Sequence, residues 1–353
     1  MLDRPVLRPR GSGHAKLHHP PTERKDMQKR SKRSSRLNYG WGRQLRYAMC
    51  QAVHSFYGWN DHFGTRRTHG YRIRIFARFC LRQGINDARL VTQSTLDLYG
   101  EYLRNRLQGE YVWPDGSADR QVSVAYAHNL ISSANTALYA MRGNSKIDLS
   151  ALVALSASRR HVRDEPAEAD REAVTLASQQ MVAKGDGRGA AVALLTRHWG
   201  MRAQEATLQD LQRMKREIAG SGGASILEGC KGGREDRGRW IPATPERVAA
   251  LEFALKAHPI GSRCMLNEGE SVKVFYQREL NRCRRVLRSL GITSYRELRA
   301  GFAADVYESV TGVPPMKGFI VPRDLDKKAR LEVARVLGHR REQVSSGYVG
   351  GYR

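Results

Sequence analysis

A histidine and a tyrosine close to the C-terminal end of the sequence stand nine positions apart, at His339 and Tyr348. The histidine closes the triplet LGH, and the tyrosine lies in the stretch SSGYVGG. Two arginines further upstream, Arg202 and Arg299, lie in segments with a helical pattern. Taken together, these residues predict the end of a phosphotransfer site that uses tyrosine as its nucleophile. Because histidine and tyrosine are common residues, the prediction depends on support from the rest of the chain.

The charge balance of the chain points to a polyanionic partner. Lys and Arg number 60 against 35 Asp and Glu, which gives a net charge of +25 and a pI near 10.3. This excess extends along the whole chain, whereas an ordinary solvated surface carries both signs in rough balance. Nucleic acid is therefore the expected partner, with an anionic membrane or another acidic partner as the alternatives.

The cysteines and the apolar patterning indicate a soluble protein of a reducing compartment. The five cysteines are widely spaced and form no Cys-x-x-Cys pair, so we expect neither a disulfide framework nor a structural zinc site. The sequence contains no run of eighteen apolar residues, and its start lacks the apolar core of a signal peptide. We therefore expect a cytoplasmic protein.

Composition shifts divide the 353 residues into an arm, two domains and a linker. Residues 1–36 hold eleven Lys or Arg against three acids, which predicts a disordered basic arm that either tracks DNA or serves only solubility. Apolar stripes at three- and four-residue spacing predict a helical domain over residues 37–145, with basic outer faces. Residues 146–168 are charged and contain Pro166, as expected of a linker. The second domain then covers residues 169–353.

The second domain combines helices with one β-hairpin, so the predicted fold is mainly α with a small β element (α+β). An apolar helix over 188–199 should be buried in its core, and Gly200 interrupts this helix. Residues 224–243 form two β-prone segments joined by KGGRED, whose adjacent glycines suit a tight turn. Further helices are expected over 295–310 and 326–337, with a Pro/Gly-rich insertion between them.

Four motifs, in this order, resemble those of the tyrosine site-specific recombinases, the phage-type integrases. GMRAQEATLQDL is similar to the family's first arginine box, a hairpin lysine lies in GCKGGREDRGRWIP, YRELRAGFAADVY surrounds the second arginine, and Leu-Gly-His precedes the tyrosine. The resemblance covers about residues 170–353, and the helical region before it looks like the family's core-binding domain. It implies the two-domain architecture of the family, with a core-binding domain followed by a catalytic domain.

The resemblance assigns a role to each motif residue. Arg202 and Arg299 would clamp the nonbridging phosphate oxygens, because a planar guanidinium stays charged and binds them bidentately. His339 would donate a further hydrogen bond to the same phosphate, and Lys231 would protonate the departing 5′ oxygen. Tyr348 would be the nucleophile. The chemistry implied requires no metal and no nucleotide cofactor.

Two further positions bear on the same site. Glu205 would orient the site or balance its charge, and on its spacing alone it could equally be an i,i+3 partner of Arg202. The family usually has a histidine three residues before the second arginine, and this sequence has Arg296 there. A guanidinium is a poor general base, so Arg296 either marks reduced or lost activity or acts as a third phosphate clamp.

Two assignments have competitors in the sequence. The hairpin lysine, Lys231, has three arginines as neighbours: Arg234, Arg237 and Arg239. Tyr352 competes with Tyr348, but it stands thirteen residues after the histidine and close to the end of the chain. We therefore favour Tyr348.

The function implied by the resemblance is site-specific DNA recombination through a 3′-phosphotyrosyl intermediate, for the integration and excision of a bacterial mobile element. Double-stranded DNA would be the partner, a homotetramer would hold two sites together, and DNA-bending or directionality factors would be possible accessories. Two alternatives remain. A catalytically silent relative would bind DNA as an architectural or regulatory factor, and a type-IB-like topoisomerase would share the chemistry without pairing two sites.

Overall fold

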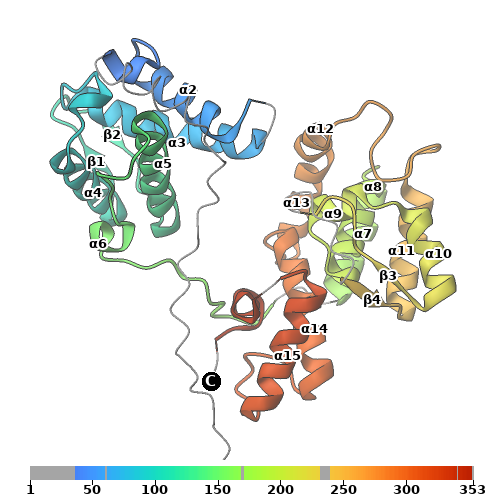
Figure 1. The fold of residues 1–353 in the computed structure, drawn as a ribbon. Coiled ribbons are helices and arrows are strands. Elements are labelled where there is room, and N and C mark those ends of the chain that lie inside the picture. The colour runs from blue at the N-terminus through green and yellow to red at the C-terminus, as the bar shows by residue number, and fades with distance from the viewer. Residues whose placement is uncertain (1–35, 60–61, 168–170, 231–238, 340, 352–353) are drawn as a thin grey trace, which may run out of the picture. The chain divides into compact units, whose positions relative to one another are not determined.

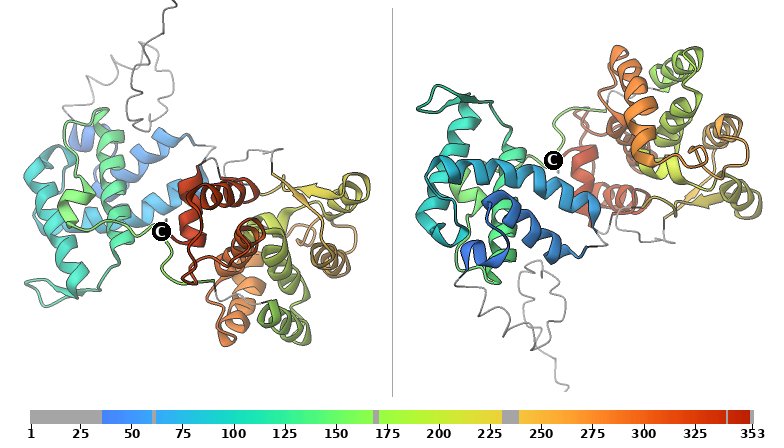
Figure 2. Two further views of the ribbon diagram at one scale, coloured as in Figure 1. Left: turned by 90° about the horizontal axis from the view of Figure 1, so that it is seen from below. Right: turned by 90° about the horizontal axis from the view of Figure 1, so that it is seen from above.

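The chain forms two compact units that divide between Arg159 and Arg160. This is a computed structural model, and it describes residues 36–59, 62–167, 171–230, 239–339 and 341–351. Figures 1 and 2 show the units from three directions, and each is described here by itself. The predicted basic arm lies outside the described residues except for Arg36. The division falls inside the predicted linker, 146–168, so the two halves of that stretch belong to different units.

The first unit is helical, with one short antiparallel hairpin. Its elements are η1 (Leu37–Gly40), α2 (Leu45–Tyr57), α3 (Phe63–Arg82), η2 (Ala88–Leu90), α4 (Gln93–Gln108), β1 (Tyr111–Val112), β2 (Ala118–Asp119), α5 (Val124–Arg142) and α6 (Ala151–Leu155). Thr92 is the N-cap of α4, and its hydroxyl accepts a hydrogen bond of 3.3 Å from the Thr95 amide. Leu149 and Leu155, from the stretch predicted as a linker, are buried in this unit's core.

The second unit contains the remaining helices and the predicted hairpin. Its elements are α7 (Arg171–Ala183), α8 (Gly187–Trp199), α9 (Ala203–Leu208), α10 (Leu211–Ser221), β3 (Gly223–Ser225), β4 (Trp240–Pro242), α11 (Pro245–Ala257), α12 (Val272–Phe275), the π-helix η3 (Tyr276–Leu280), α13 (Asn281–Ser289), α14 (Tyr295–Thr311), α15 (Arg323–Val336), η4 (Glu342–Ser345) and α16 (Ser346–Val349). Strands β3 and β4 pair antiparallel, with Ala224 opposite Ile241. The predicted turn, KGGRED, falls within residues 231–238, which lie outside the described residues.

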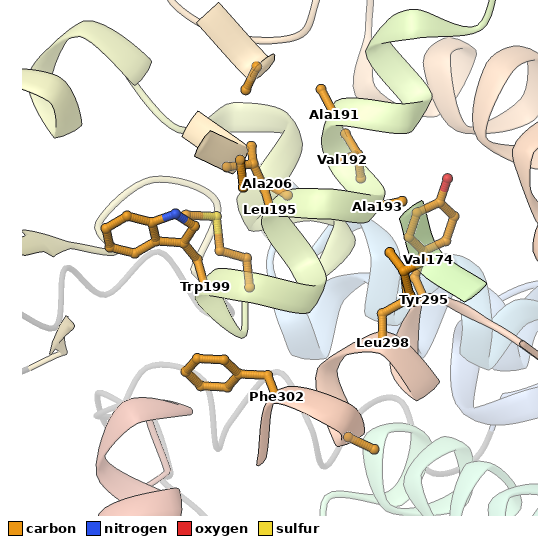
Figure 3. Close-up of a cluster of buried hydrophobic side chains, with 14 of the residues drawn as sticks. Val174, Ala191, Val192, Ala193, Leu195, Trp199, Ala206, Tyr295, Leu298 and Phe302 are labelled. Carbon is orange, nitrogen blue, oxygen red and sulfur yellow. The ribbon is translucent and has the colours of Figure 1, made fainter. Parts of the chain in front are cut away.

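Helix α8 is the centre of the second unit's core, as its apolar sequence predicted. It packs against α7, α11 and α14, and the side chains of Val192, Leu195 and Trp199 are fully buried. Figure 3 shows these side chains beside Leu298 and Phe302 of α14. Despite this apolar run, no helix in the described ranges has the length and hydropathy needed to cross a membrane. The burial of α8 fixes the position of its C-terminal end, where the candidate site begins.

The end of α8 lies unusually close to α14. Gly200 caps the helix with φ +60°, and a Cβ atom placed on it would lie 2.3 Å from Cδ1 of Phe302. Only glycine combines a left-handed backbone with this close approach. This contact brings the start of α9, with Arg202, close to α14, which carries Arg299 in its second turn.

Gly200→Ala is expected to lower the free energy of unfolding by about 2–5 kcal/mol, since it adds a left-handed backbone penalty to a steric clash with Phe302. Gly222→Ala is the matched control, because Gly222 also caps a helix with positive φ but has open space around it. That control should lose only about 1–2 kcal/mol. Urea unfolding of both variants measures the difference, and equal losses would show that the contact with Phe302 costs nothing.

Candidate active site

Carbonyl groups at two helix ends hold two buried guanidinium groups. The Gly200 carbonyl, after α8, accepts hydrogen bonds from Arg299 Nη1 at 2.6 Å and from Arg239 Nη2 at 2.9 Å. At the end of α15, the Val336 carbonyl accepts from Arg239 Nε at 2.8 Å and the Leu337 carbonyl from Arg299 Nη2 at 2.6 Å. The carboxyl end of a helix carries partial negative charge, so both positions favour a cation. These contacts fix the two arginines between α8, α14, α15 and β4.

The Leu-Gly-His triplet forms the end of α15. The Gly338 amide donates to the Arg335 carbonyl at 3.0 Å, and the His339 amide donates to the Ala334 carbonyl at 2.7 Å. With Gly338 at φ +66°, this is a Schellman-type helix end. The glycine is needed for a second reason, since a Cβ there would lie 3.1 Å from Cδ of Arg239. The Leu-Gly-His triplet therefore places His339 at a fixed position beside the buried arginines.

Glu205 is the anionic centre of this cluster. It is completely buried, and its carboxylate accepts from the Arg202 amide at 2.7 Å, from Arg239 Nη1 at 2.7 Å and from Arg299 Nη1 at 3.3 Å. The Arg202 guanidinium also pairs with it. Burial alone would raise the pKa of Glu205, but the guanidinium groups of Arg239, Arg299 and Arg202 outweigh this effect and hold the pKa below its usual value. The carboxylate is therefore ionised at neutral pH.

The cluster retains an excess of positive charge. Three guanidinium groups surround the single carboxylate of Glu205. Burial and the neighbouring Arg239 lower the pKa of Arg299 to about 10, so Arg299 is still charged at neutral pH. Arg202 differs from the other two because about a third of its side chain is exposed. An anion that approaches from solvent therefore meets Arg202 first, with a fixed positive field behind it.

His339 and Tyr348 face one another beside the cluster. Their ring centroids are 5.8 Å apart, and the Tyr348 ring also lies 5.8 Å from the guanidinium carbon of Arg299. Two buried nitrogens here, His339 Nε2 and Arg299 Nε, have no hydrogen-bond partner among the described residues. Burial and the charges of Arg299, Arg202 and Arg239 lower the pKa of His339 to about 4. The imidazole is therefore neutral at pH 7 and offers one N–H donor.

This pKa makes acid destabilise the folded chain. Between about pH 6.5 and pH 4 the imidazole of the unfolded chain takes up a proton that folded His339 refuses, so stability falls as the pH falls through this window. We expect His339→Gln to lose less stability than the wild type when urea unfolding is repeated at pH 5 and pH 7. The pH-dependent loss of the variant must be subtracted from that of the wild type, because His198, whose pKa is also lowered to about 4, adds the same kind of loss in both proteins. Equal losses in the two proteins would contradict the assigned shift.

Tyr348 is carried by the short helix α16, and it is largely buried, with 9% of its surface exposed. Arg296, in the first turn of α14, is exposed and places its guanidinium carbon 5.8 Å from the centre of the Tyr348 ring. Within the described part of the chain, the Arg296 guanidinium makes no hydrogen bond or ion pair. It lies beside the tyrosine ring and is free to contact an anion.

The structure thus brings together six of the seven residues proposed from the sequence: Arg202, Glu205, Arg296, Arg299, His339 and Tyr348. The seventh, Lys231, lies outside the described residues, as do its possible competitors Arg234 and Arg237. The third competitor, Arg239, is 1% exposed and fully engaged inside the cluster, so it cannot serve as a mobile proton donor.

Sequence analysis missed the structural importance of Arg239. The signal was present in β4 and its flank, where burial alternates along the chain. Arg239 and Ile241 are buried, and Trp240 between them is 37% exposed. A period of two places residues 239 and 241 on one face of a strand, so an arginine in register with a core isoleucine predicts a buried cation with an acidic partner.

The donors of the cluster are guanidinium and imidazole groups around one engaged carboxylate, a set whose chemistry suits an anion. In addition, the described residues include no group of three or more His, Cys, Asp or Glu side chains that could hold a metal ion. The arrangement can bind a phosphate from several sides and hold a tyrosine beside it.

Comparison with solved structures identifies the fold. No family model and no curated protein matches the sequence. Among solved structures, the chain is similar to the Tn1549 transposon integrase in complex with circular intermediate DNA, with 14% identity, a TM-score of 0.53, and coverage of 86% of this chain and 96% of that one. A second structure of that integrase, in complex with transposon right end DNA, gives a TM-score of 0.55 at 14% identity, with coverage of 86% and 95%. The chain therefore has the tyrosine recombinase fold to which its motifs pointed.

Proposed function

We propose that this protein is a site-specific DNA recombinase that cleaves and rejoins strands through a covalent link to Tyr348. The observation that carries the proposal is the convergence of Arg202, Arg299, His339 and Tyr348 around one cationic cluster. A cluster built only for stability would balance its charges. This one leaves three guanidinium groups against one carboxylate and places a tyrosine beside the excess.

In the proposed reaction, Tyr348 gives its phenolic proton to water, and its oxygen attacks the phosphorus of a phosphodiester and forms a new P–O bond. The bond from phosphorus to the 5′ oxygen breaks, and the 5′ oxygen leaves as a hydroxyl after it takes a proton from Lys231. Arg202 and Arg299 stabilise the charge on the nonbridging oxygens, and neutral His339 donates its hydrogen bond to one of them. A 5′ hydroxyl reverses the step and rejoins the strand. The phosphotyrosyl link conserves the bond energy, so the proposed scheme uses no cofactor.

Double-stranded DNA is the proposed substrate. The net charge of +25 supports this, and the Tn1549 transposon integrase, which shares the fold, is bound to DNA in both structures. We further propose that the natural reaction moves a bacterial mobile element, that a homotetramer holds the two sites together, and that the protein acts on the nucleoid in the cytoplasm with help from DNA-bending or directionality factors.

The experiment that tests the proposal is a trapping assay. Incubation with duplexes nicked next to candidate cleavage sites lets the 5′ leaving fragment diffuse away, so a protein–DNA adduct should accumulate and survive SDS. The adduct should form equally well in EDTA. If the wild type binds its site yet never becomes linked to it, the recombinase proposal fails.

The second candidate function is that of a silent DNA-binding relative, and Arg296 is the observation that favours it. The residue stands where the family usually has histidine, and it is exposed beside the tyrosine ring. Such a protein would shift the mobility of DNA in EDTA without forming an adduct. The trapping assay therefore separates the two candidates directly.

Arg296→His is expected to slow cleavage by about 10²–10³-fold, the loss that follows removal of one donor to a developing oxyanion. We expect this because the free guanidinium beside Tyr348 is placed to act as a third phosphate clamp, and charge stabilisation dominates phosphoryl transfer. Single-turnover rates on one nicked site at one salt concentration measure the effect. A faster variant would show instead that the position serves proton transfer, which imidazole can perform and guanidinium cannot.

A further inference from the structure

The segment that follows the division between the two units lies along the tyrosine-bearing end of the chain. We call residues 160–166 the strap. The amide of Arg163 donates a hydrogen bond of 2.9 Å to the carbonyl of Ser346, two residues before Tyr348. A chain stretch that sequence analysis had taken for part of a linker is thus bonded directly to α16.

Glycines in the tyrosine segment allow this approach. A Cβ on Gly347 would lie 3.2 Å from the His161 carbonyl oxygen, and a Cβ on Gly351 would lie 3.3 Å from Cγ1 of Val162. Both distances are tighter than ordinary contact. The backbone on either side of Tyr348 therefore packs closely against the strap, and a side chain at either glycine would require the strap to shift by a few tenths of an ångström.

The Arg163 side chain ties the strap to α14. Its guanidinium forms a two-pronged ion pair with Glu297, with Nη1 to Oε2 at 3.0 Å, and the two side chains are only 19% and 11% exposed. The same guanidinium donates to the Pro166 carbonyl at 2.9 Å. Glu297 lies between Arg296 and Arg299 on α14, so one arginine connects the helix that carries the clamp to the segment that carries the tyrosine.

We propose that Arg163 is a positioning residue that holds the Tyr348 segment in register with Arg299, the member of the phosphate clamp that lies on α14. The inference rests on the proposed function for its catalytic meaning. The phenolic oxygen must lie in line with the bond that breaks, and a displacement of about 1 Å can slow a reaction on the order of 10²-fold. Arg163 fixes both the backbone before Tyr348 and the position of the strap against α14, while its own side chain stays away from the phosphate.

The test compares Arg163→Ala with Arg160→Ala in the full chain. Arg160 belongs to the same strap and has the same charge, but it pairs only with Asp164 on the surface, where both side chains are largely exposed. The two variants therefore lose the same charge, and any shared fall in DNA affinity cancels. If loss of the ion pair unfolds Arg163→Ala, the double variant Arg163→Gln with Glu297→Gln removes the tie without leaving a buried charge unpaired.

Two readouts are needed. Amide hydrogen exchange over residues 346–351 should become at least tenfold faster in Arg163→Ala or in the double variant, and should not change in Arg160→Ala. The single-turnover cleavage rate should fall by about ten- to a hundredfold in the same variants. The DNA affinity should equal that of Arg160→Ala for Arg163→Ala, and that of the wild type for the double variant, whose net charge is unchanged. Arg163→Lys should give intermediate exchange and cleavage rates, because an ammonium keeps the charge but cannot form the two-pronged ion pair with Glu297.

The outcomes separate this inference from the proposed function. Unchanged exchange would overturn the tie, whether or not the protein is active. Faster exchange with an unchanged cleavage rate would overturn the positioning role. If exchange becomes faster but the wild type never forms an adduct, the proposed function fails. The tie between Arg163 and α14 would then stand as a structural contact without a catalytic role.

Discussion

Changing Tyr348 to phenylalanine is expected to abolish the covalent adduct while the protein still folds and binds DNA. The ring packs beside His339, Arg296 and Arg299, and phenylalanine preserves that ring and its contacts. Only the hydroxyl is lost, and with it the one atom that can form the phosphotyrosyl bond. The expected effect is a complete loss of SDS-stable adduct, with a gel-shift affinity like that of the wild type.

The matched control for this change is Tyr295→Phe. Tyr295, the first residue of α14, is another buried tyrosine of the same unit, and Figure 3 shows it within the hydrophobic core, near Val174. Its variant should form the adduct at close to the wild-type level. If Tyr348→Phe also formed the adduct, another residue would have to be the nucleophile.

Glu205→Gln is expected to cause the largest loss of stability of any single change in the cluster. The carboxylate is fully buried and pairs with Arg239 and Arg299, which are 1% and 3% exposed, so its removal leaves uncompensated cations in the interior. Breaking a buried pair in this way costs about 3–5 kcal/mol. The amide keeps the shape of the side chain, so the loss reports charge and not volume. Urea unfolding of the full chain, followed by circular dichroism, measures it.

Glu332→Gln supplies the comparison. Glu332 pairs with Arg335 on the surface of α15, where the two side chains are 36% and 42% exposed, and its loss should cost no more than about 1 kcal/mol. Added phosphate should also affect the stability of the Glu205 variant. Because Glu205→Gln makes the cluster more positive, added phosphate should stabilise it more than the wild type. Equal losses in the two variants would mean that Glu205 does not hold the cluster together.

Sequence patterns within short segments predicted the features of this fold that depend on neighbouring residues, such as helix burial and helix ends. The apolar run in α8 predicted a buried helix, and Gly200 predicted its end, because both follow from side-chain burial and from a backbone conformation that only glycine adopts easily. The hairpin strands followed from their β-prone composition. The order of the motifs pointed to the fold that the comparison with solved structures confirms.

Contacts between distant segments were not predictable in the same way. Arg239 looked like one of several hairpin cations, and only packing between β4, α8 and α15 shows that it is buried against Glu205. The strap looked like a solvated linker, because a charged stretch with proline gives no sign of the partner that will bury Arg163. In both cases the partner lies far away in sequence, so neither periodicity nor composition carries the information.

The most direct test of the central claim is to identify the linked atom in the trapped adduct. After nuclease and trypsin digestion, Tyr348 and its competitor Tyr352 fall in one peptide, residues 342–353, so fragmentation by mass spectrometry must assign the modified side chain. We predict a nucleotide joined through its 3′ phosphate to the oxygen of Tyr348. A link to Tyr352 or to any other residue, or a link through a 5′ phosphate, would contradict the account.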